Sequence, residues 1–342
     1  MSLKNLNASN KTHKFLIKKL KNKRTLQIYK KFEKNLNLDH NFIVAVSGGA
    51  DSLALSFLAK VYSIKKSLNA RYFLVDHKLR ENSSLEANFV KKILSKLSIK
   101  LVILKWDGIK PRSNIQSIAR SKRYALLKKQ SEKLKINHIL LGHHKDDLIE
   151  NFFIRMLRGS GLNGMISFDE KSENERINII RPLLKFSKKD LLFISKHVFN
   201  TYIDDPSNEN KIFQRVRIRN LIKTLKLEGL DNNKFNLTIN NLKSANKALE
   251  FYAKRNVLEN SFFNSEKHSI ILSKDFFAQP NEIILRSFIK VIQTISRNYY
   301  PPRGKSIKNL IIEIKSKKTK QKFTLGGCIF EKINETVIIS KE

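Results

Sequence analysis

Short apolar runs alternate with longer stretches of helical periodicity between about residue 40 and residue 185. Four runs predict strands, namely FIVAVS (42–47), RYFLVD (71–76), KLVILKW (100–106) and HILLG (138–142). A helix is predicted after each of them, from about Asp51, through 84–97, through 115–134 and from about Asp146. Strands separated by helices of this length predict βαβ crossovers and a parallel sheet with helices on both faces. We therefore expect a Rossmann-like, doubly wound α/β domain that binds ligands at the carboxyl ends of its strands.

The alternation stops after about residue 225, so we expect an α/β domain over 40–225 and a second domain over 226–342. The segment NLTINNLKSANKALEFYAKRNVLENSFF (236–263) has apolar residues at three- and four-residue spacing, which predicts a helix. After a break at YYPPRGKS (299–306), the segment KFTLGGCIFEKINETVIISKE (322–342) predicts short strands around a Gly-Gly turn. The second domain is therefore expected to be a mainly helical region with a small α+β tail.

Charge is the strongest feature of the composition, because 67 Lys and Arg oppose 30 Asp and Glu, a formal net charge of +37. This charge favours nucleic acid as a partner over a membrane surface or an acidic protein. The alternative is a background bias toward Lys, Asn and Ile, with lysine on solvated faces. Residues 1–39 predict a basic helical extension, whose KKLKNKR segment (18–24) either faces phosphate or, as we favour, is a solvated or frayed terminus.

The single cysteine, Cys328, excludes a disulfide framework and a four-thiolate zinc site within the chain. Such cysteine usage is typical of a reducing compartment, and we expect a cytoplasmic protein. The apolar runs are far shorter than the ~20 residues that a membrane-spanning helix needs, and the first residues lack the apolar core of a secretory signal. We expect no membrane partner.

The segment VAVSGGADS (44–52) places two glycines and a helix start directly after a predicted strand. Gly48 and Gly49 let the backbone approach an anion, and the N–H groups at the start of the next helix point toward it. A Walker loop would continue with Gly-Lys-Ser/Thr, which is absent here. Asp51 is present instead, and a carboxylate beside phosphates is useful mainly where Mg²⁺ bridges them. The alternative is an ordinary glycine turn with a Ser or Asp helix cap.

The segment GHHKDDLIEN (142–151) follows the strand HILLG. His143, Asp147 and Glu150 fall at i, i+4 and i+7, which predicts one face of a helix at the ligand edge. The two carboxylates suit Mg²⁺ or an amine, and His143 suits a phosphate or a proton, whereas zinc is disfavoured because no cysteine is near. The alternative is a solvated acidic helix start stabilised by the helix dipole.

The glycines of GSGLNG (159–164) match the dinucleotide-binding pattern Gly-x-Gly-x-x-Gly. They follow a helical segment, whereas that motif requires a preceding strand, so we reject a nicotinamide cofactor. We expect a mobile or closely packed loop near the site.

The Ser-Gly-Gly-x-Asp-Ser loop after a strand resembles the signature of the N-type ATP pyrophosphatases, the PP-loop superfamily. Further blocks are similar to the tRNA(Ile)-lysidine synthetases, namely VDHKLRENSSLEA (75–87), ARSKRYALL (119–127), GHHKDDLIENFFIRMLRGSGLNGM (142–165), RPLLKFSKKDL (181–191), DPSNENKIFQRVRIRN (205–220), PPR (301–303) and TLGG (324–327). The resemblance is dense over 43–220 and weak over 230–298. Lys78 departs from it, because the family usually has glycine there.

The resemblance implies an ATP site, a lysine site and an RNA surface. The residues implied for ATP are Ser47, Gly48, Gly49, Ala50, Asp51, Ser52, Asp76, His77 and Arg120, with Mg²⁺ on Asp51. Asp147 and Glu150 are implied for L-lysine, and together with Asp51 and His143 they form the implied catalytic group. The residues implied for tRNA are Arg155, Arg158, Arg215, Arg217 and Arg219, each of which has an ordinary surface ion pair or solvation as its alternative. The resemblance also implies that the second domain, 226–342, recognises tRNA. A helix over residues 215–219 would place Arg215 and Arg219 on one face without Arg217. An extended segment would place all three of these arginines on one face.

The resemblance also implies the reaction and its partners. The O2 atom of the wobble cytidine, in tRNA(Ile) with a CAU anticodon, attacks the α-phosphate of ATP and pyrophosphate leaves. Free L-lysine then attacks carbon 2 through its ε-amine, AMP departs and lysidine is formed. The cytidine must leave the anticodon stack, which costs little in a single-stranded loop.

Other functions stay open at this point. A thiolating tRNA enzyme of the same fold would need reactive cysteines, which Cys328 alone does not supply. A small-molecule adenylating enzyme would need no strongly basic surface, and a non-catalytic RNA-binding module would bind tRNA without releasing pyrophosphate from ATP. The sequence predicts neither the general base nor the oligomeric state, and a homodimer is compatible with it.

Overall fold

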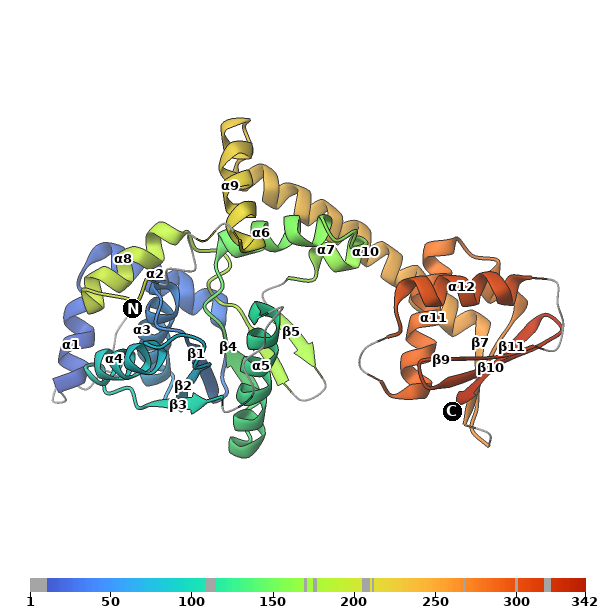
Figure 1. The fold of residues 1–342 in the computed structure, drawn as a ribbon, viewed down its shortest axis with the longest axis horizontal. Helices are drawn as coiled ribbons and strands as arrows, with labels where there is room; N and C mark the ends of the chain where they lie inside the picture. The colour runs from blue at the N-terminus through green and yellow to red at the C-terminus, as the bar shows by residue number, and fades with distance from the viewer. Residues whose placement is uncertain are drawn as a thin grey trace. The chain divides into compact units, whose positions relative to one another are not determined.

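The computed structural model describes residues 11–106, 108, 115–168, 171–174, 177–204, 210, 212–266, 268–298, 301–316 and 321–342 (Figure 1). Parts of two predicted segments, 205–209 with 211 and 299–300, lie outside the described residues. The chain forms two compact units, Met1–Asp231 and Asn232–Glu342. None of the helices in the described ranges combines the length and the apolar character needed to cross a bilayer.

The first unit contains a six-stranded sheet in the order β3-β2-β1-β4-β6-β5. Five strands are parallel and β5 is an antiparallel edge strand. The strands are β1 (Phe42–Val46), β2 (Ala70–Asp76), β3 (Leu101–Lys105), β4 (His138–Leu140), β5 (Lys171–Asn174) and β6 (Ile177–Ile180). The four predicted strands are confirmed, and the predicted parallel sheet is confirmed with them. The order reverses between β1 and β4, so the loops that follow these two strands meet at one edge.

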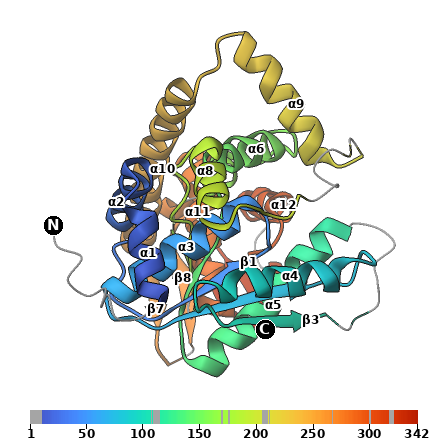
Figure 2. The same cartoon turned by 90° about the vertical axis from the view of Figure 1, so that its left-hand side faces the viewer.

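Alternation along the strands explains why both faces are covered. Phe42 and Val44 of β1 belong to one hydrophobic core, whereas Ile43 belongs to another on the opposite face. Figure 2 shows the sheet and its helices from the side. The helices of this unit after β1 are α3 (Ala50–Lys65), α4 (Ser83–Ser95), α5 (Ile115–Leu134), α6 (Lys145–Met156), α7 (Leu162–Ile166), α8 (Lys188–Phe199) and α9 (Gln214–Leu227). Leu127 of α5 packs on the Ile43 face, while α3, α4 and α8 contribute to the other core.

The N-terminal extension forms two helices, α1 (Lys11–Leu20) and α2 (Lys23–Leu36), that pack into the core of the first unit. Leu16, Leu20 and Phe32 are fully or almost fully buried. Arg24 stacks over the Phe193 ring at 4.4 Å and pairs with Asp190 of α8 at 3.2 Å. The favoured prediction of a solvated or frayed terminus over 18–24 is confirmed for solvation, because Lys18, Lys21 and Lys23 are exposed. It is wrong for fraying, because the apolar side of these basic helices is buried.

The second unit combines three helices with a five-stranded antiparallel sheet in the order β7-β8-β11-β10-β9. The helices are α10 (Asn232–Asn260), α11 (Asn281–Ser296) and α12 (Gly304–Lys315), with a 3₁₀ turn η2 (Lys274–Phe277). The strands are β7 (Ser261–Asn264), β8 (Ser269–Leu272), β9 (Gln321–Leu325), β10 (Cys328–Ile333) and β11 (Thr336–Lys341). The predicted Gly-Gly turn is confirmed, since Gly326 and Gly327 have φ of +66° and +79°.

The predicted helix over 236–263 is confirmed only as far as Asn260. The last residues of that segment form β7, because Phe262 and Phe263 pair with Ile271 and Ile270 of β8 in a hairpin. The helical spacing of apolar residues therefore extends beyond Asn260, although the helix ends there because the next residues pair as a strand.

Candidate active site

The loop after β1 contains a glycine that the local backbone requires. Gly48 has φ of +87°. A Cβ atom there would lie 2.7 Å from Val90 Cγ2 and 2.9 Å from Ile203 Cδ1. The Gly48 carbonyl oxygen accepts a hydrogen bond from the Ile203 amide at 3.1 Å. A larger residue would be strained in both conformation and packing.

Ser52 braces this loop from the first turn of α3. Its Oγ accepts hydrogen bonds from the amides of Ser47 (3.1 Å) and Gly48 (3.0 Å) and donates to the Gly49 carbonyl (2.9 Å). Gly49 is the N-cap of α3, so the first N–H groups of the helix have no intrahelical acceptors. Gly142, in the turn after β4, packs against the same turn, and a Cβ there would lie 3.3 Å from the Ser52 nitrogen. The loop has the backbone geometry of an anion site, and the β4 turn lies directly beside it.

A lysine reaches this loop from a distant part of the chain. Lys188, the first residue of α8, places Nζ at 2.8 and 2.7 Å from the two carboxylate oxygens of Asp51. The sequence interpretation missed this residue. Its signal was Ser187 followed by two lysines after a buried apolar run, which is typical of a capped helix start. The loop lacks a Walker lysine in sequence, yet a cation lies beside it in space.

The acidic helix α6 begins at Lys145, close to the predicted start at about Asp146. His144 is its N-cap, and the Nδ1 atom accepts a hydrogen bond from the Asp146 amide at 3.2 Å. The Asp147 carboxylate accepts one from the His144 amide at 2.9 Å, which completes a capping box. The prediction that His143 shares a helix face with Asp147 is wrong, because this box starts the helix at Lys145 and leaves His143 in the preceding turn.

His144 connects two carboxylates that follow different strands. Its Nε2 lies 3.7 Å from Asp51 Oδ2 and 3.6 Å from Asp147 Oδ2, and the side chain is buried. Because Nδ1 accepts a backbone hydrogen bond, the proton of the neutral ring is on Nε2, which faces both carboxylates. The sequence interpretation missed this histidine, whose position between the two carboxylates depends on the proximity of the β1 and β4 loops.

His143 lies in an apolar and cationic environment. Its ring meets Phe168 edge-on with centroids 5.1 Å apart, and the Arg181 guanidinium lies 4.7 Å from the centroid of the same Phe168 ring. Burial is the main cause that lowers the pKa of His143 to about 3, and nearby arginines act in the same direction while Asp147 opposes them. The imidazole is therefore neutral at pH 7.

Asp147 and Glu150 lie about one turn apart on the buried side of α6. Burial raises the pKa of Glu150, and the guanidinium of Arg219 acts in the opposite direction. The Nε of Arg219 lies 2.5 Å from Glu150 Oε1, and the Nε of Arg215 lies 3.8 Å from Oε2. Burial raises the pKa of Asp147. The charges of His144 and His143 and the hydrogen bond from the His144 amide outweigh burial, so the pKa of Asp147 is lowered overall.

The arginine run of α9 is helical, so Arg215 and Arg219 share one face and both approach Glu150. Arg217 projects elsewhere, is exposed, and donates a hydrogen bond to the Ile212 carbonyl at 2.7 Å. Two arginines that the resemblance assigned to RNA therefore contact a buried carboxylate in this structure.

The carboxyl end of β2 is a braced turn. The Asp76 carboxylate accepts hydrogen bonds from the Lys78 amide at 2.9 Å and the Ser84 hydroxyl at 2.6 Å. Lys78 has φ of +50°, which explains why glycine suits this position. His77 packs edge-on against Trp106 at 6.0 Å, and its two buried ring nitrogens have no partner among the described residues. Burial is the main cause that lowers the pKa of His77 to about 4.

The remaining predicted arginines have separate surroundings. Arg120 donates a hydrogen bond to the Tyr124 hydroxyl at 3.0 Å on the same helix. Arg155 donates to the Gly164 carbonyl at 2.6 Å and so holds the glycine loop that follows helix α6. Arg158 is exposed. Within the described ranges no three His, Cys, Asp or Glu side chains form a metal-binding group, so a cation on Asp51 would take most of its ligands from elsewhere.

Known proteins are similar to this chain in sequence and in fold. A family model described as the PP-loop domain matches residues 19–225. The tRNA(Ile)-lysidine synthase of Wolbachia pipientis wMel is 35% identical over 303 residues, which cover 87% of this chain and 70% of that protein. The tRNA(Ile)-lysidine synthase of Orientia tsutsugamushi (strain Boryong) is 32% identical over 325 residues, which cover 91% and 71%. This chain belongs to the tRNA(Ile)-lysidine synthase family.

The resemblance inferred from the loops is thus confirmed at the level of the tRNA(Ile)-lysidine synthase family. A solved structure, the U34-tRNA thiolase NcsA from Methanococcus maripaludis with its [4Fe-4S] cluster, has a TM-score of 0.54 at 18% identity and covers 66% of this chain and 79% of that chain. At this identity the likeness concerns the fold alone. It agrees with the predicted PP-loop architecture of the first unit.

Proposed function

We propose that this chain ligates L-lysine to carbon 2 of the wobble cytidine of a tRNA(Ile) with a CAU anticodon, while ATP is cleaved to AMP and pyrophosphate. Family membership supports this reaction. The observation that carries the proposal to these residues is His144, whose Nε2 lies within 3.7 Å of carboxylates from both loops. A nucleotide site and an amine site would then share one edge of the sheet.

In this proposal ATP lies across the carboxyl ends of β1 and β2. Its phosphates meet the SGGADS loop and the start of α3. Its base lies near His77, whose ring nitrogens are buried and without partners among the described residues. Asp51 suits Mg²⁺ as a single carboxylate ligand, with phosphate oxygens and water as the others, and the ion would neutralise charge on the departing pyrophosphate. Lys188 would exchange its contact with Asp51 for one with phosphate.

The chemistry then proceeds in two balanced steps. Cytidine O2 forms a bond to the α-phosphorus, and the bond from that phosphorus to the oxygen that bridges to the β-phosphate breaks. The ε-ammonium of lysine then gives one proton to solvent. The neutral ε-amine forms a bond to carbon 2, the bond from carbon 2 to O2 breaks, AMP leaves with that oxygen, and the nitrogen gives a second proton to solvent. The loop amides and Lys188 would stabilise the negative charge that develops in the first step.

Asp147 and Glu150 are proposed to bind L-lysine. Asp147 carries a lowered pKa and faces His144, so it suits the ε-ammonium group as the amine arrives. Glu150 is occupied by Arg219, so it accepts lysine only if that ion pair rearranges. His143, with a pKa of about 3, serves as a neutral hydrogen-bonding group and not as the general base.

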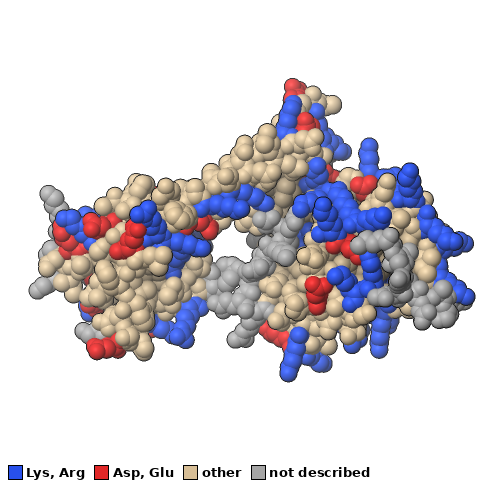
Figure 3. Space-filling view, turned by 180° about the vertical axis from the view of Figure 1, so that it is seen from behind, with Lys and Arg blue, Asp and Glu red and all other residues tan. Residues whose placement is uncertain are grey.

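The RNA would approach over a basic surface. Figure 3 shows that Lys and Arg are more frequent than Asp and Glu on the visible face of the first unit. The exposed arginines Arg158 and Arg217 suit phosphate contacts, while Arg155, Arg215 and Arg219 also support the site from within. We also propose a cytoplasmic location, since ATP, lysine and tRNA are all present there.

A thiolating enzyme of the same fold is the second candidate by fold alone, but Cys328 disfavours it. This cysteine is the only one in the sequence and is fully buried in the second unit. Burial raises the pKa of its thiol to about 11, which opposes formation of a nucleophilic thiolate.

The test mixes the purified chain with ATP, Mg²⁺, labelled L-lysine and tRNA transcripts that differ only in the anticodon. We expect lysine incorporation and equimolar pyrophosphate release with CAU alone. Incorporation into every transcript, or into none, would contradict the proposal. Tight tRNA binding without pyrophosphate release would identify a non-catalytic RNA-binding module instead.

A further inference from the structure

We infer that the outer side of α10 and the edge strand β7 bind an unpaired segment of the tRNA by stacking its bases on Phe251 and Phe262. This inference rests on tRNA as the substrate of the proposed function. It adds a second RNA contact of a different kind, because base stacking on aromatic rings does not depend on phosphate charge.

One side of α10 is used for packing. Asn256 donates hydrogen bonds to the Phe276 carbonyl at 3.3 Å and the Ser287 hydroxyl at 3.1 Å, and Asn246 accepts one from Arg286 at 2.8 Å. These buried residues fix the orientation of the helix against α11. The opposite side of α10 must therefore face solvent.

On that opposite side, basic and apolar residues alternate along the helix. Lys247, Phe251, Lys254 and Leu258 follow one another at spacings of four, three and four residues, so they form one stripe along the helix. All four are exposed, and Phe251 is 62% exposed. Phe251 also meets the ring of Tyr252 edge-on at 5.5 Å. We call these four residues the outer stripe.

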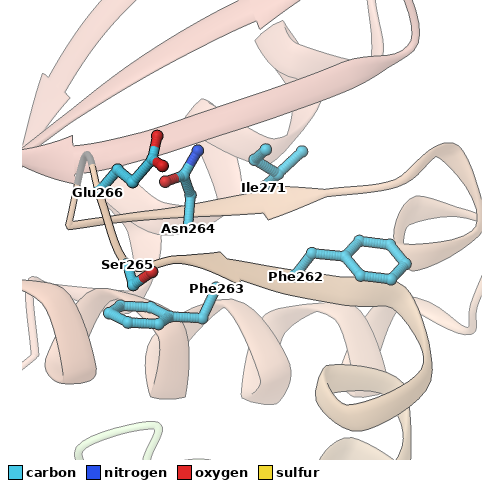
Figure 4. Close-up of a pocket in the computed structure, with 6 residues that line it drawn as sticks. All are labelled: Phe262, Phe263, Asn264, Ser265, Glu266 and Ile271. Carbon is cyan, nitrogen blue, oxygen red and sulfur yellow. The ribbon is translucent and has the colours of Figure 1, made fainter.

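The strand β7 continues directly from the end of α10 and lies at the edge of its sheet. Phe262 and Phe263 are 62% and 65% exposed. They line a shallow cavity of about 400 Å³ with Asn264, Ser265 and Glu266. Figure 4 shows the two rings spaced along β7 and the three polar residues at the hairpin end. Ring faces beside groups that donate and accept hydrogen bonds suit a nucleobase.

A polyanion suits this surface better than a second copy of the chain. The lysines of the outer stripe would repel the same stripe of another copy, since the chain as a whole carries +37. Phosphates would neutralise them, and the exposed rings would cover bases that have no partner. Exposed apolar groups in the outer stripe are then explained by the ligand that the charge also favours.

The test measures binding of the full chain to a labelled tRNA(Ile) transcript and to a single-stranded 12-mer RNA, by fluorescence anisotropy at several salt concentrations. Phe251→Ala and Phe262→Ala are expected to weaken binding about 5- to 20-fold at fixed salt and to leave the salt dependence unchanged. Phe262→Tyr should bind within about twofold of wild type, because the ring is kept. Lys247→Met should instead lower the slope of log affinity against log salt by about 0.7 for the single strand.

Leu237→Ala is the matched control, since Leu237 is 61% exposed on the same helix but has no ring and lies outside the outer stripe. Melting curves of each variant establish that it is folded. Wild-type affinity in both Phe→Ala variants would overturn the inference. So would a Phe→Ala variant that sediments as a monomer where wild type is a dimer, because a second copy would then cover the surface. Binding is measured without ATP or lysine, so failure of the proposed function would show separately as a wild-type chain that binds RNA and incorporates no lysine.

Discussion

Asp51 and Glu150 both lie at the ligand edge of the sheet, and each pairs with a cation from a later part of the chain. Asp51 is 25% exposed and its partner Lys188 is 41% exposed. Glu150 is only 4% exposed, while its partner Arg219 is 38% exposed. Both members of the first pair are partly exposed to water, whereas the carboxylate of the second pair is buried.

The difference indicates two kinds of pair. Water screens the Asp51–Lys188 contact, so little free energy is lost when a ligand separates the two groups. Glu150 has lost its hydration, so its charge depends on Arg219 and Arg215 for compensation. We expect the first pair to open during each turnover and the second to stabilise the position of α9.

The largest predicted effect belongs to the exposed carboxylate. Asp51→Ala should lower ATP-dependent pyrophosphate release about 1,000-fold, because the proposed ligand for Mg²⁺ is lost, and should leave tRNA affinity within about twofold. Rapid-quench assays with labelled ATP and a filter-binding assay measure the two quantities. Asp39→Ala is the control, since Asp39 also pairs with a lysine, Lys66, at 3.1 Å. Equal losses in both variants would contradict the proposed metal role of Asp51.

The buried pair should govern stability. Glu150→Gln leaves two guanidinium groups without their carboxylate and should lower the free energy of unfolding by about 2 kcal/mol, a value reduced because Arg219 is partly exposed. Adding Arg219→Gln should recover part of that loss. Urea unfolding of the two single variants and the double variant measures the coupling. Strictly additive losses would mean that the pair contributes no coupling.

Lys188→Met tests whether the exposed pair opens for phosphate. The KM for ATP should rise about 10-fold, equivalent to about 1.4 kcal/mol, because one cation is lost from the phosphate site. The free energy of unfolding should change by less than about 1 kcal/mol. Lys189→Met provides the adjacent exposed lysine for comparison. An unchanged KM with lower stability would make the Asp51 contact purely structural.

The smallest effect concerns pH and the buried side of the site. His143 has a folded pKa of about 3, below its ordinary value, so the unfolded chain binds a proton first as the pH falls below about 6.5. Stability should therefore decrease from pH 6.5 downward, by about 1 kcal/mol at about pH 5.8 from this residue. His143→Asn should flatten that part of the unfolding curve. His268→Asn, at an exposed histidine of the second unit, should leave it unchanged.

Local residue order was sufficient for the four predicted strands β1 to β4, the helices that follow them and the SGGADS loop. Each depends on neighbours in the chain: a continuous apolar run for β1, a positive φ at Gly48, and a helix start at Ala50. The strands β5 to β8 were not predicted. The same reasoning was wrong for His143, because the choice between two adjacent histidines as the N-cap is made by a capping box with Asp147. The prediction of fraying over residues 18–24 was also wrong, because Leu20 and the other apolar side chains of α1 and α2 pack into a core to which α8 contributes.

Chain folding decided the partners of the charged groups. The meeting of Lys188 with Asp51, of Arg219 with Glu150, and of His144 with both loops depends on the strand order β1-β4 and on where α8 and α9 return. Acidic and basic residues are both frequent along this chain, so the local sequence pattern does not indicate which acid pairs with which cation. Only the packing of the sheet and its helices brings Lys188 within 3 Å of Asp51 and Arg219 within 3 Å of Glu150, because the partners lie 137 and 69 residues apart in the chain.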